Sequence, residues 1–532
     1  MKRCPECRRD YYDDTLSFCL EDGAPLVYGL SQDEPATAIL SVPAVAGGSK
    51  VENDKTRVFK VDSTDAKMEP KGGTPNNSIA VLPFVHMSAD TDNEYFCDGL
   101  AEELLNALAK VDDLKVAART SSFSFRDKNT SIGEIGRALG VKTILEGSVR
   151  KSGDRMRITV QLVNAADGYH LWSERYDPGM QDIFDVQDAI TLAVVDALKL
   201  KLLGTEKAAV LKRHTENTEA YKAYLMGRYL RHTKNDHGGA RRAFEEAVRV
   251  DPTSAPSWVG LAEGTILAAH YSLIPALEAI ATAKAALATA KELQGESADG
   301  FYVEGFIAYV EADWPSADKA YRRAIVLEPN HTQALGSFGL ILCVRGQFDE
   351  ALTFFQRARE SDPLSPFPYA ISGVGLGIAG QLEQSMRFYE QALTFEKQNI
   401  LALWGSCAAN IRSGRFDEGI AAAETVVAVS RRAGFFLGVL GWALAVAGRT
   451  EEANAILAEL RNRPAGAPSL VSEVWLLSAL GDKEAAFKLL EKAEGEHQAF
   501  VYYVGLAGFD VLRGDSRLND LIRRNGLPEQ PI

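Results

Sequence analysis

Long apolar runs are absent from this sequence. No stretch reaches the roughly 18–20 apolar residues that a membrane-spanning helix requires, and the chain begins with MKRCPEC rather than with the apolar segment of a secretory signal. A surplus of positive charge is also missing, because 58 basic residues stand against 72 acidic ones and the net charge is −14. We therefore expect a cytoplasmic protein without a membrane span, and nucleic acid is disfavoured as its main partner.

Cysteine is scarce, with six residues in a chain of 532. This number excludes a disulfide framework, which small secreted domains build from closely spaced cysteines. Cys97, Cys343 and Cys407 are far apart and lie in apolar helical patterns. We expect these three side chains to fill the core, as free cysteines commonly do.

The other three cysteines lie within the first twenty residues. Cys4 and Cys7 form a C-x2-C knuckle, and Cys19 begins a C-x2-D sequence that places Asp22 at the fourth ligand position. This spacing predicts a short zinc ribbon with a structural, closed Cys3Asp site. Two alternatives stay open: a redox pair, which would require a βαβ context that is not visible here, and a knuckle that has lost its metal.

The residues CPEC and FCLEDGAPL give this segment a resemblance to the zinc-ribbon leaders of some bacterial signalling proteins, over residues 1–28. The resemblance implies an accessory or recognition module and no reaction. Residues 29–76 are rich in Ser, Pro, Ala, Gly, Asp and Lys and have no sustained periodicity, which predicts a flexible linker.

Residues 77–205 show the pattern of one α/β domain. A short apolar run at 78–84, an amphipathic helix at 94–111, a strand at 114–120 and a short helix at 131–140 come first. Two hairpin turns then divide residues 143–176 into three strands, and a last helix covers 183–202. The predicted order is β-α-β-α-β-β-β-α, with Phe96, Leu100, Leu104, Leu105 and Leu108 on the buried face of the first helix.

Three stretches within residues 78–203 resemble the amino-terminal domain of TolB: SIAVLPFVHMSADTDNEYFCDGLAEELLNAL, ILEGSVRKSGDRMRITVQLVNAADGYHLWSERYD and IFDVQDAI. In soluble bacterial regulators this domain accompanies kinase, cyclase or winged-helix effectors and helical repeats. The resemblance implies a small binding fold and supplies no catalytic residues.

Catalytic motifs are missing from the same range. The candidate polar residues form no nucleophile elbow, paired-carboxylate motif or H-E-x-x-H sequence; they are His86, Asp98, Arg119, Glu146, His170 and Glu174. A kinase or cyclase is disfavoured as well, because no H-R-D, D-F-G or glycine-rich loop is present. We therefore predict that the protein is not an enzyme.

The strongest periodicity lies in residues 215–505. Gly346, Gly380, Gly414 and Gly448 follow one another at intervals of 34 residues, and Gly481 follows after 33. A 34-residue helix–turn–helix period is the signature of tetratricopeptide repeats, of which we expect about eight, one of them irregular near residues 271–293. Residues 506–532 break the period and are predicted to form a C-terminal cap and tail.

Together these patterns predict a multidomain protein: a zinc ribbon, an α/β domain and an all-α tetratricopeptide solenoid. Such a solenoid receives protein segments in a concave groove, for which we consider Tyr221, Lys222, Tyr224, Trp258, Glu263 and Tyr302, although most of the aromatic ones fit a core equally well. We expect a scaffold or adaptor in bacterial signalling, with possible homo-oligomers through the α/β domain. The alternative function is a sensor whose α/β domain binds a small molecule or nucleotide.

Overall fold

The computed structural model describes residues 2–3, 10–11, 27–28, 77–87, 94–126, 128–152, 155–179, 182–200, 202, 204–213, 215–463, 469–498 and 500–528. The chain divides into two compact units, residues 1–61 and residues 62–532. The predicted zinc ligands Cys4, Cys7, Cys19 and Asp22 and the predicted linker at 29–76 lie outside the described residues.

The first unit contains three short strands, β1 (Lys2–Arg3), β2 (Asp10–Tyr11) and β3 (Val27–Tyr28). They pair antiparallel, and β1 lies between β2 and β3.

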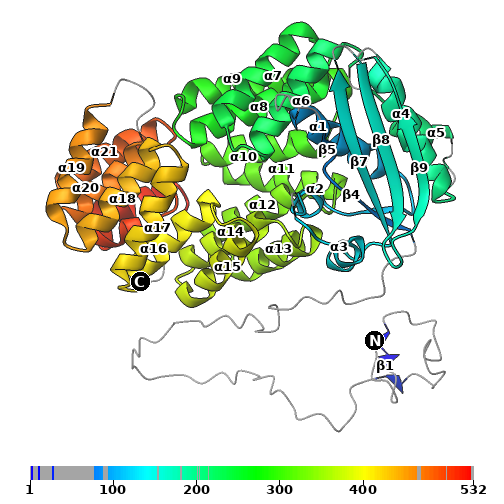
Figure 1. Cartoon of the computed structure of the whole chain (residues 1–532). Helices are drawn as coiled ribbons and strands as arrows, with labels where there is room; N and C mark the ends of the chain where they lie inside the picture. The colour runs from blue at the N-terminus through cyan, green and yellow to red at the C-terminus, as the bar shows by residue number, and fades with distance from the viewer. Residues whose placement is uncertain are drawn as a thin grey trace. The chain divides into compact units, whose positions relative to one another are not determined.

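The second unit begins with a mixed sheet (Figure 1). The predicted order of elements is confirmed, with short additions at β5, α2 and α5. The elements are β4 (Ser78–Val81), β5 (Val85–His86), α1 (Glu94–Leu108), β6 (Lys115–Val116), α2 (Arg119–Phe123), α3 (Ile132–Leu139), β7 (Thr143–Ser152), β8 (Arg155–Asn164), β9 (His170–Tyr176), α4 (Ile183–Ala197) and α5 (Gly204–Val210).

The sheet has the strand order β6-β4-β7-β8-β9, with β5 also paired to β7. β4 runs parallel to β6 and β7, whereas β7, β8 and β9 form the predicted antiparallel meander. The predicted strand at 114–120 is too long. Only Lys115 and Val116 pair with β4, and the chain then leaves the sheet, so that Arg119 begins helix α2.

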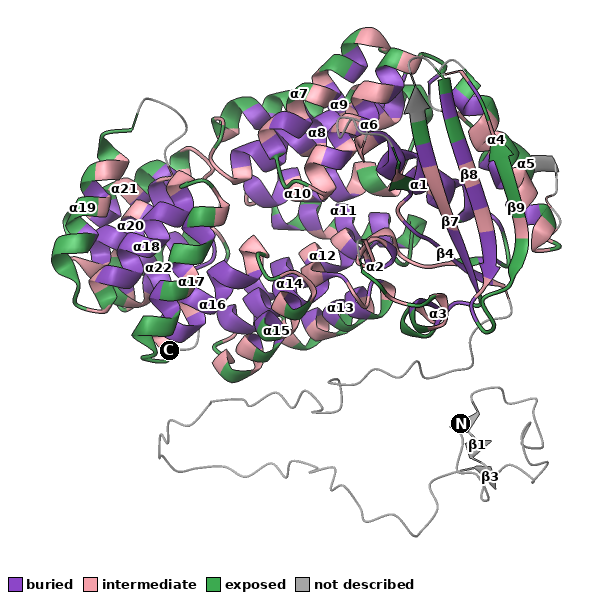
Figure 2. Ribbon diagram, in the orientation of Figure 1, coloured by how far each residue is buried: buried purple, intermediate pink, exposed green. Residues whose placement is uncertain are grey.

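Helices cover the two faces of this sheet to different extents (Figure 2). Helices α1 and α4 cover one face, where the inward side chains of β7 and β8 are buried with the predicted apolar face of α1, including Phe96, Leu100 and Leu104. Helix α3 covers only one end of the other face, around Ile144 and Ala80. Ser131 and Glu134 form a capping box that starts α3, and Gly140 ends it in the left-handed conformation.

Helix pairs make up the rest of the second unit. Over residues 215–463, 469–498 and 500–528 the pairs are α6 (Thr218–His232) with α7 (His237–Val250), α8 (Ala255–His270) with α9 (Ala276–Gln294), α10 (Ala298–Val310) with α11 (Trp314–Leu327), α12 (Thr332–Val344) with α13 (Phe348–Ser361), α14 (Pro366–Ile378) with α15 (Leu382–Phe395), α16 (Ile400–Arg412) with α17 (Phe416–Val429), α18 (Gly434–Val446) with α19 (Thr450–Arg461), and α20 (Leu470–Ala479) with α21 (Lys483–Gly495). A 3-10 helix, η3 (Ala507–Leu512), and α22 (Ser516–Arg524) follow.

The periodic glycines turn the chain between the helices of a pair. Gly346, Gly380 and Gly414 have φ of 74°, 76° and 76°, a conformation that a residue without Cβ adopts at little cost. The irregular repeat is also confirmed, because α9 has 19 residues whereas α11 and α13 have 14 each. The predicted core cysteines Cys97, Cys343 and Cys407 are all buried.

Candidate functional site

A buried carboxylate joins the sheet to the first repeat. Glu102 projects from α1 and is only 4% exposed; it accepts a hydrogen bond at 2.8 Å from Arg119 Nε of α2 and another from Arg228 of α6. Burial alone would raise the pKa of Glu102, but the two guanidinium groups lower it below its ordinary value. We call Glu102, Arg119 and Arg228 the latch, because they hold α1, α2 and α6 together.

Two further acidic residues, Asp98 and Glu94, lie one and two turns before Glu102 on α1. Asp98 accepts a hydrogen bond from Arg126, and Glu94 accepts hydrogen bonds from Arg126 at 3.2 Å and from the Tyr229 hydroxyl of α6 at 2.5 Å. The contact between α1 and α6 is close, since a Cβ on Gly99 would lie 2.6 Å from Leu225. The α/β part therefore packs directly against the first repeat.

Helix α2 extends this contact to a distant repeat. The Ser121 amide donates a hydrogen bond at 2.9 Å to Asp362, which caps the end of α13, and the Leu364 amide donates one at 3.0 Å to the Ser121 hydroxyl. Burial raises the pKa of Asp362, although the bonds from Ser121 oppose this shift. The α/β part thus contacts both the first helix pair and the end of the fourth.

Charged side chains continue from the latch along successive first helices of the repeats. Arg231 on α6 pairs with Glu263 on α8 at 3.0 Å, and Asp299 on α10 pairs with His331, the N-cap of α12, at 3.0 Å. Because first helices line the concave side of such a solenoid, we call these four residues the charged floor. The Asp299 side chain is 64% exposed, so the floor is open to solvent there.

The charges of the floor act on one another. The surrounding protein partly desolvates Asp299 although its side chain reaches solvent, and this would raise its pKa, but His331 and Arg228 lower it to about 2. Burial would lower the pKa of His331, yet Asp299, Glu328 and Glu263 raise it above its ordinary value. The latch and the floor therefore form one electrostatically connected strip.

The groove residues considered from the sequence lie mostly elsewhere. Tyr221, Tyr224 and Tyr302 are buried in the core, where Tyr221 packs against Phe184 and Tyr224 against Phe244. Lys222 pairs with Glu219 at the start of α6, and the Trp258 indole donates to the backbone oxygen of Pro252. Only Glu263 belongs to the floor.

The C-terminal segment, residues 500–528, covers another part of the first helices. The Phe500 ring lies 4.7 Å from His270 at the end of α8, 5.2 Å from Trp404 of α16 and 4.4 Å from Phe435 of α18. Phe500 has φ of 68°, which is rare for a bulky residue. This aromatic cluster was not foreseen from the sequence, because its members are far apart in the chain.

The same segment also contacts the third and sixth helix pairs. The Trp314 indole at the start of α11 donates a hydrogen bond at 2.7 Å to the backbone oxygen of Asn525, and Arg412 of α16 binds the carboxylate of Asp510. As predicted, the segment also covers the last helix pair, where Phe509 packs against Trp475. It therefore does more than cap the end of the stack.

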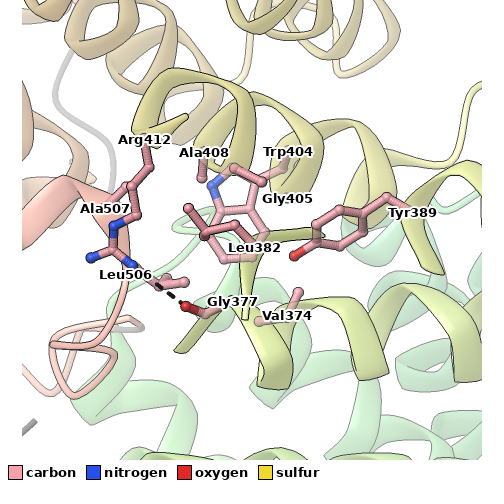
Figure 3. Close-up of a pocket in the computed structure, with 11 residues that line it drawn as sticks. Val374, Gly377, Leu382, Tyr389, Trp404, Gly405, Ala408, Arg412, Leu506 and Ala507 are labelled. Atoms are coloured by element: carbon pink, nitrogen blue, oxygen red, sulfur yellow. Dashed lines mark hydrogen bonds between the residues drawn. The ribbon is translucent and has the colours of Figure 1, made fainter. Parts of the chain in front are cut away.

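Two cavities border these contacts. One, of about 20 Å³, lies between Tyr389, Trp404, Arg412 and Leu506 (Figure 3). The other, of about 30 Å³, lies between α1, α4 and α6 near Gln187 and Tyr221. Each volume corresponds to about one or two water molecules, so neither accommodates an organic ligand.

The polar candidates of the α/β part separate into two groups. Asp98 and Arg119 lie at the contact with the repeats, as described above. Glu146 and Glu174 lie on β7 and β9, where Glu174 accepts a hydrogen bond from Tyr176 at 2.8 Å, and His86 and His170 lie on β5 and β9. The structure does not bring the six residues together into one site.

The described part of the chain contains neither a metal-binding cluster nor a membrane-spanning helix. No group of three or more His, Cys, Asp or Glu side chains there could hold a metal ion. None of the helices described has the length and apolar character needed to cross a bilayer.

Replacing Glu102 by Gln should release the α/β part from the repeats. The substitution leaves Arg119 and Arg228 without the carboxylate that accepts their hydrogen bonds, and breaking such a buried pair costs about 3–5 kcal/mol. We expect a loss of this size in urea unfolding, with faster proteolysis within residues 77–205. Glu219→Gln, which removes an exposed pair with Lys222, is the control and should cost less than about 1 kcal/mol. Equal effects of the two variants would refute the latch.

Acid should weaken the second repeat through His270. Burial among aromatic rings lowers the pKa of His270 from 6.5 to about 4. The unfolded chain therefore takes up this proton first, and stability is lost as the pH falls from 6.5 towards 4. In urea unfolding the wild type should lose on the order of 2 kcal/mol more than His270→Phe between pH 7.5 and pH 5. Parallel pH profiles of the two proteins would show that His270 is not held neutral.

Comparison with known proteins identifies two parts of the chain. Residues 75–193 match the family described as the second domain of HilA/YgeH-like transcriptional regulators. Residues 303–366 and 409–467 match a tetratricopeptide-repeat family. The predicted likeness to the TolB amino-terminal domain stays a prediction.

One curated relative is a protein named putative adenylate cyclase 3 from Rhizobium meliloti strain 1021, with 41% identity over 186 residues. The match covers 35% of this chain and 32% of the relative, so the chain spans about a third of that protein's length.

Two solved structures are similar to parts of this chain. YrrB, whose structure is described as a TPR protein with an unusual peptide-binding site, has 22% identity and covers 38% of this chain and 97% of its own, with a TM-score of 0.23. A human IFIT1 dimer with m7Gppp-AAAA has 12% identity and covers 64% of this chain and 79% of its own, with a TM-score of 0.40. The helix pairs within residues 303–366 and 409–467 match tetratricopeptide repeats.

Proposed function

We propose that the protein is a non-enzymatic adaptor that holds protein partners on its tetratricopeptide repeats, in the cytoplasm of a bacterium and within a signalling or regulatory system. The observation that carries this proposal is the stack of helix pairs, because such repeats bind protein segments along their first helices. The match to a transcriptional-regulator domain over residues 75–193 supports the regulatory setting.

The charged floor is the part of the concave side that we propose as the partner site. Aromatic residues on α8, α16 and α18 are covered by Phe500, whereas Asp299 on α10 is exposed. A partner segment that presents a basic side chain to Asp299 and an acidic one to Arg231 would complement this strip.

The relative named putative adenylate cyclase 3 suggests a cyclase as another function. We favour the adaptor, because the sequence has no cyclase motif that we identify and the match covers only a third of that relative. A ligand-sensing role for the α/β part gains little support from the cavity beside α1 and α4, since about 30 Å³ holds no nucleotide.

Charge reversal at the floor tests the adaptor function. Asp299→Arg should abolish co-purification of specific proteins from the source bacterium that the wild type retains, because it places a repulsive charge in the groove. Glu390→Arg makes the same charge change on an exposed position of α15, a second helix, and should retain them. Loss of partners in both variants or in neither would contradict the proposed site. Cyclic AMP formation from ATP by the wild type would contradict the non-enzymatic function.

We further propose that Cys4, Cys7, Cys19 and Asp22 bind one structural zinc ion, an assignment that rests on their spacing. Plasma mass spectrometry should find about one zinc per chain, and the Cys4→Ser/Cys7→Ser variant should lose it. Cys343→Ala, which changes a buried core cysteine, should retain the metal. Equal zinc content in the three proteins would contradict the assignment.

A further inference from the structure

The second face of the sheet is open beyond α3. On β8, Met156, Ile158 and Val160 point to the face covered by α1 and α4 and are buried. Since side chains alternate along a strand, Arg155 and Arg157 point to the other face. The register places Arg150 of β7 and Arg175 of β9 on that face as well.

Arg150, Arg155, Arg157 and Arg175 are exposed, and we call them the arginine face. The Arg157 side chain is 53% exposed and that of Arg175 is 62% exposed. Asp177 is the acidic partner of both, at 2.6 Å from Arg157 and 3.3 Å from Arg175. The register places Glu146 of β7 on the same face. Four positive charges therefore face two acidic residues, Asp177 and Glu146, in a chain whose net charge is −14.

The pairing of Arg150 with Arg157 is unfavourable for the sheet itself. The two residues are directly opposite on adjacent antiparallel strands, where like charges destabilise the pair. A residue such as threonine would suit this position better, because β-branched residues favour strands. The free energy lost to this repulsion is compensated if an external anionic group binds between the two side chains.

Strand β9 adds a second feature to the same surface. It pairs with β8 on one side, and in the described part of the chain no strand pairs with its other side. Its residues are largely exposed, including Leu171 at 49%, and Tyr169 just before the strand is 75% exposed. An edge with free backbone groups is a template for an added strand.

We propose that the free edge of β9 and the arginine face together bind an extended acidic segment of a partner protein. The segment pairs with β9 as an additional strand and places alternate carboxylates beside Arg175 and Arg157. Its intervening apolar side chains lie towards α4, on the side where Trp172 and Tyr176 pack against the core. This surface is separate from the charged floor, so the inference goes beyond the proposed function of the repeats.

Two other occupants fit less well. A second copy of the chain, joined edge to edge through β9, would form one continuous sheet with the arginines of both copies on the same face. The positive charges of the two copies would then repel one another. A single-stranded nucleic acid is bound by aromatic rings that stack with bases as well as by positive charge. The register places Ser148 and Thr159 beside the arginines and Glu146, Gln161 and Ser173 in the next row of the same face, and none of these is aromatic.

The test uses the full chain and a labelled, end-blocked ten-residue peptide of alternating glutamate and valine. Fluorescence anisotropy should detect binding that the matched lysine–valine peptide does not show, and hydrogen exchange should show newly protected amides in β9. Arg157→Glu/Arg175→Glu should weaken binding about tenfold or more. Arg249→Glu on α7, another exposed arginine, should leave it unchanged. Binding that does not respond to the double variant would overturn the proposal.

A milder variant covers the possibility that charge reversal disturbs folding. Arg150→Thr should weaken peptide binding while the thermal midpoint of the free protein stays the same or rises, because the opposed charges are removed. A lower midpoint would assign Arg150 a structural role and overturn the proposal. Tighter binding of a twenty-nucleotide oligothymidine than of the acidic peptide would assign the face to nucleic acid instead, and dimers lost in the double variant would assign it to a second copy.

Discussion

The arrangement of the second unit depends on one buried carboxylate. A charge as enclosed as Glu102 is stable only when its partners are also in place, and its partners come from α2 and α6. The sheet, the short helix after β6 and the first repeat therefore meet at this carboxylate, and the bond between Tyr229 and Glu94 and the close approach of Gly99 to Leu225 extend the contact. Helix α2 also binds Asp362 through Ser121. It therefore connects the first helix pair, through Glu102, to the end of the fourth.

The two ends of the repeats have different surfaces as a result. Near the latch the first helices carry paired charges, with Asp299 exposed. Farther along the chain they carry aromatic residues, which the C-terminal segment covers through Phe500 and its neighbours. A partner that enters the groove without displacing part of the chain would meet the charged part, so recognition there depends on electrostatic complementarity more than on apolar burial.

Local patterns in the sequence were sufficient to predict the elements. The 34-residue interval of Gly346, Gly380 and Gly414 predicted the repeat and its turns, because the left-handed conformation at the turn is a property of the residue itself. The apolar period of α1 and the capping box of α3 are equally local. The ends of β6 were less predictable, since Arg119 leaves the strand for a helix that is held by tertiary contacts.

The contact surfaces could not be predicted from local patterns, because they join residues that are far apart in the sequence. Arg228 follows Glu102 by 126 residues, and Asp362 follows Ser121 by 241, so no spacing rule could connect them. Tyr221 and Tyr224 are residue types common in binding grooves, yet Phe184 of α4 covers Tyr221 and Phe244 of α7 covers Tyr224. The predicted metal ligands Cys4, Cys7, Cys19 and Asp22 follow from a short spacing, and they lie outside the described residues.

Native-state hydrogen exchange in increasing urea tests most directly whether the α/β part and the first repeat are one cooperative unit. If the latch holds them together, the slowest amides of α1 and α6 should merge into the same opening reaction, with one free energy and one dependence on urea. Separate reactions, in which α1 and the sheet open while α6 stays protected, would contradict this account.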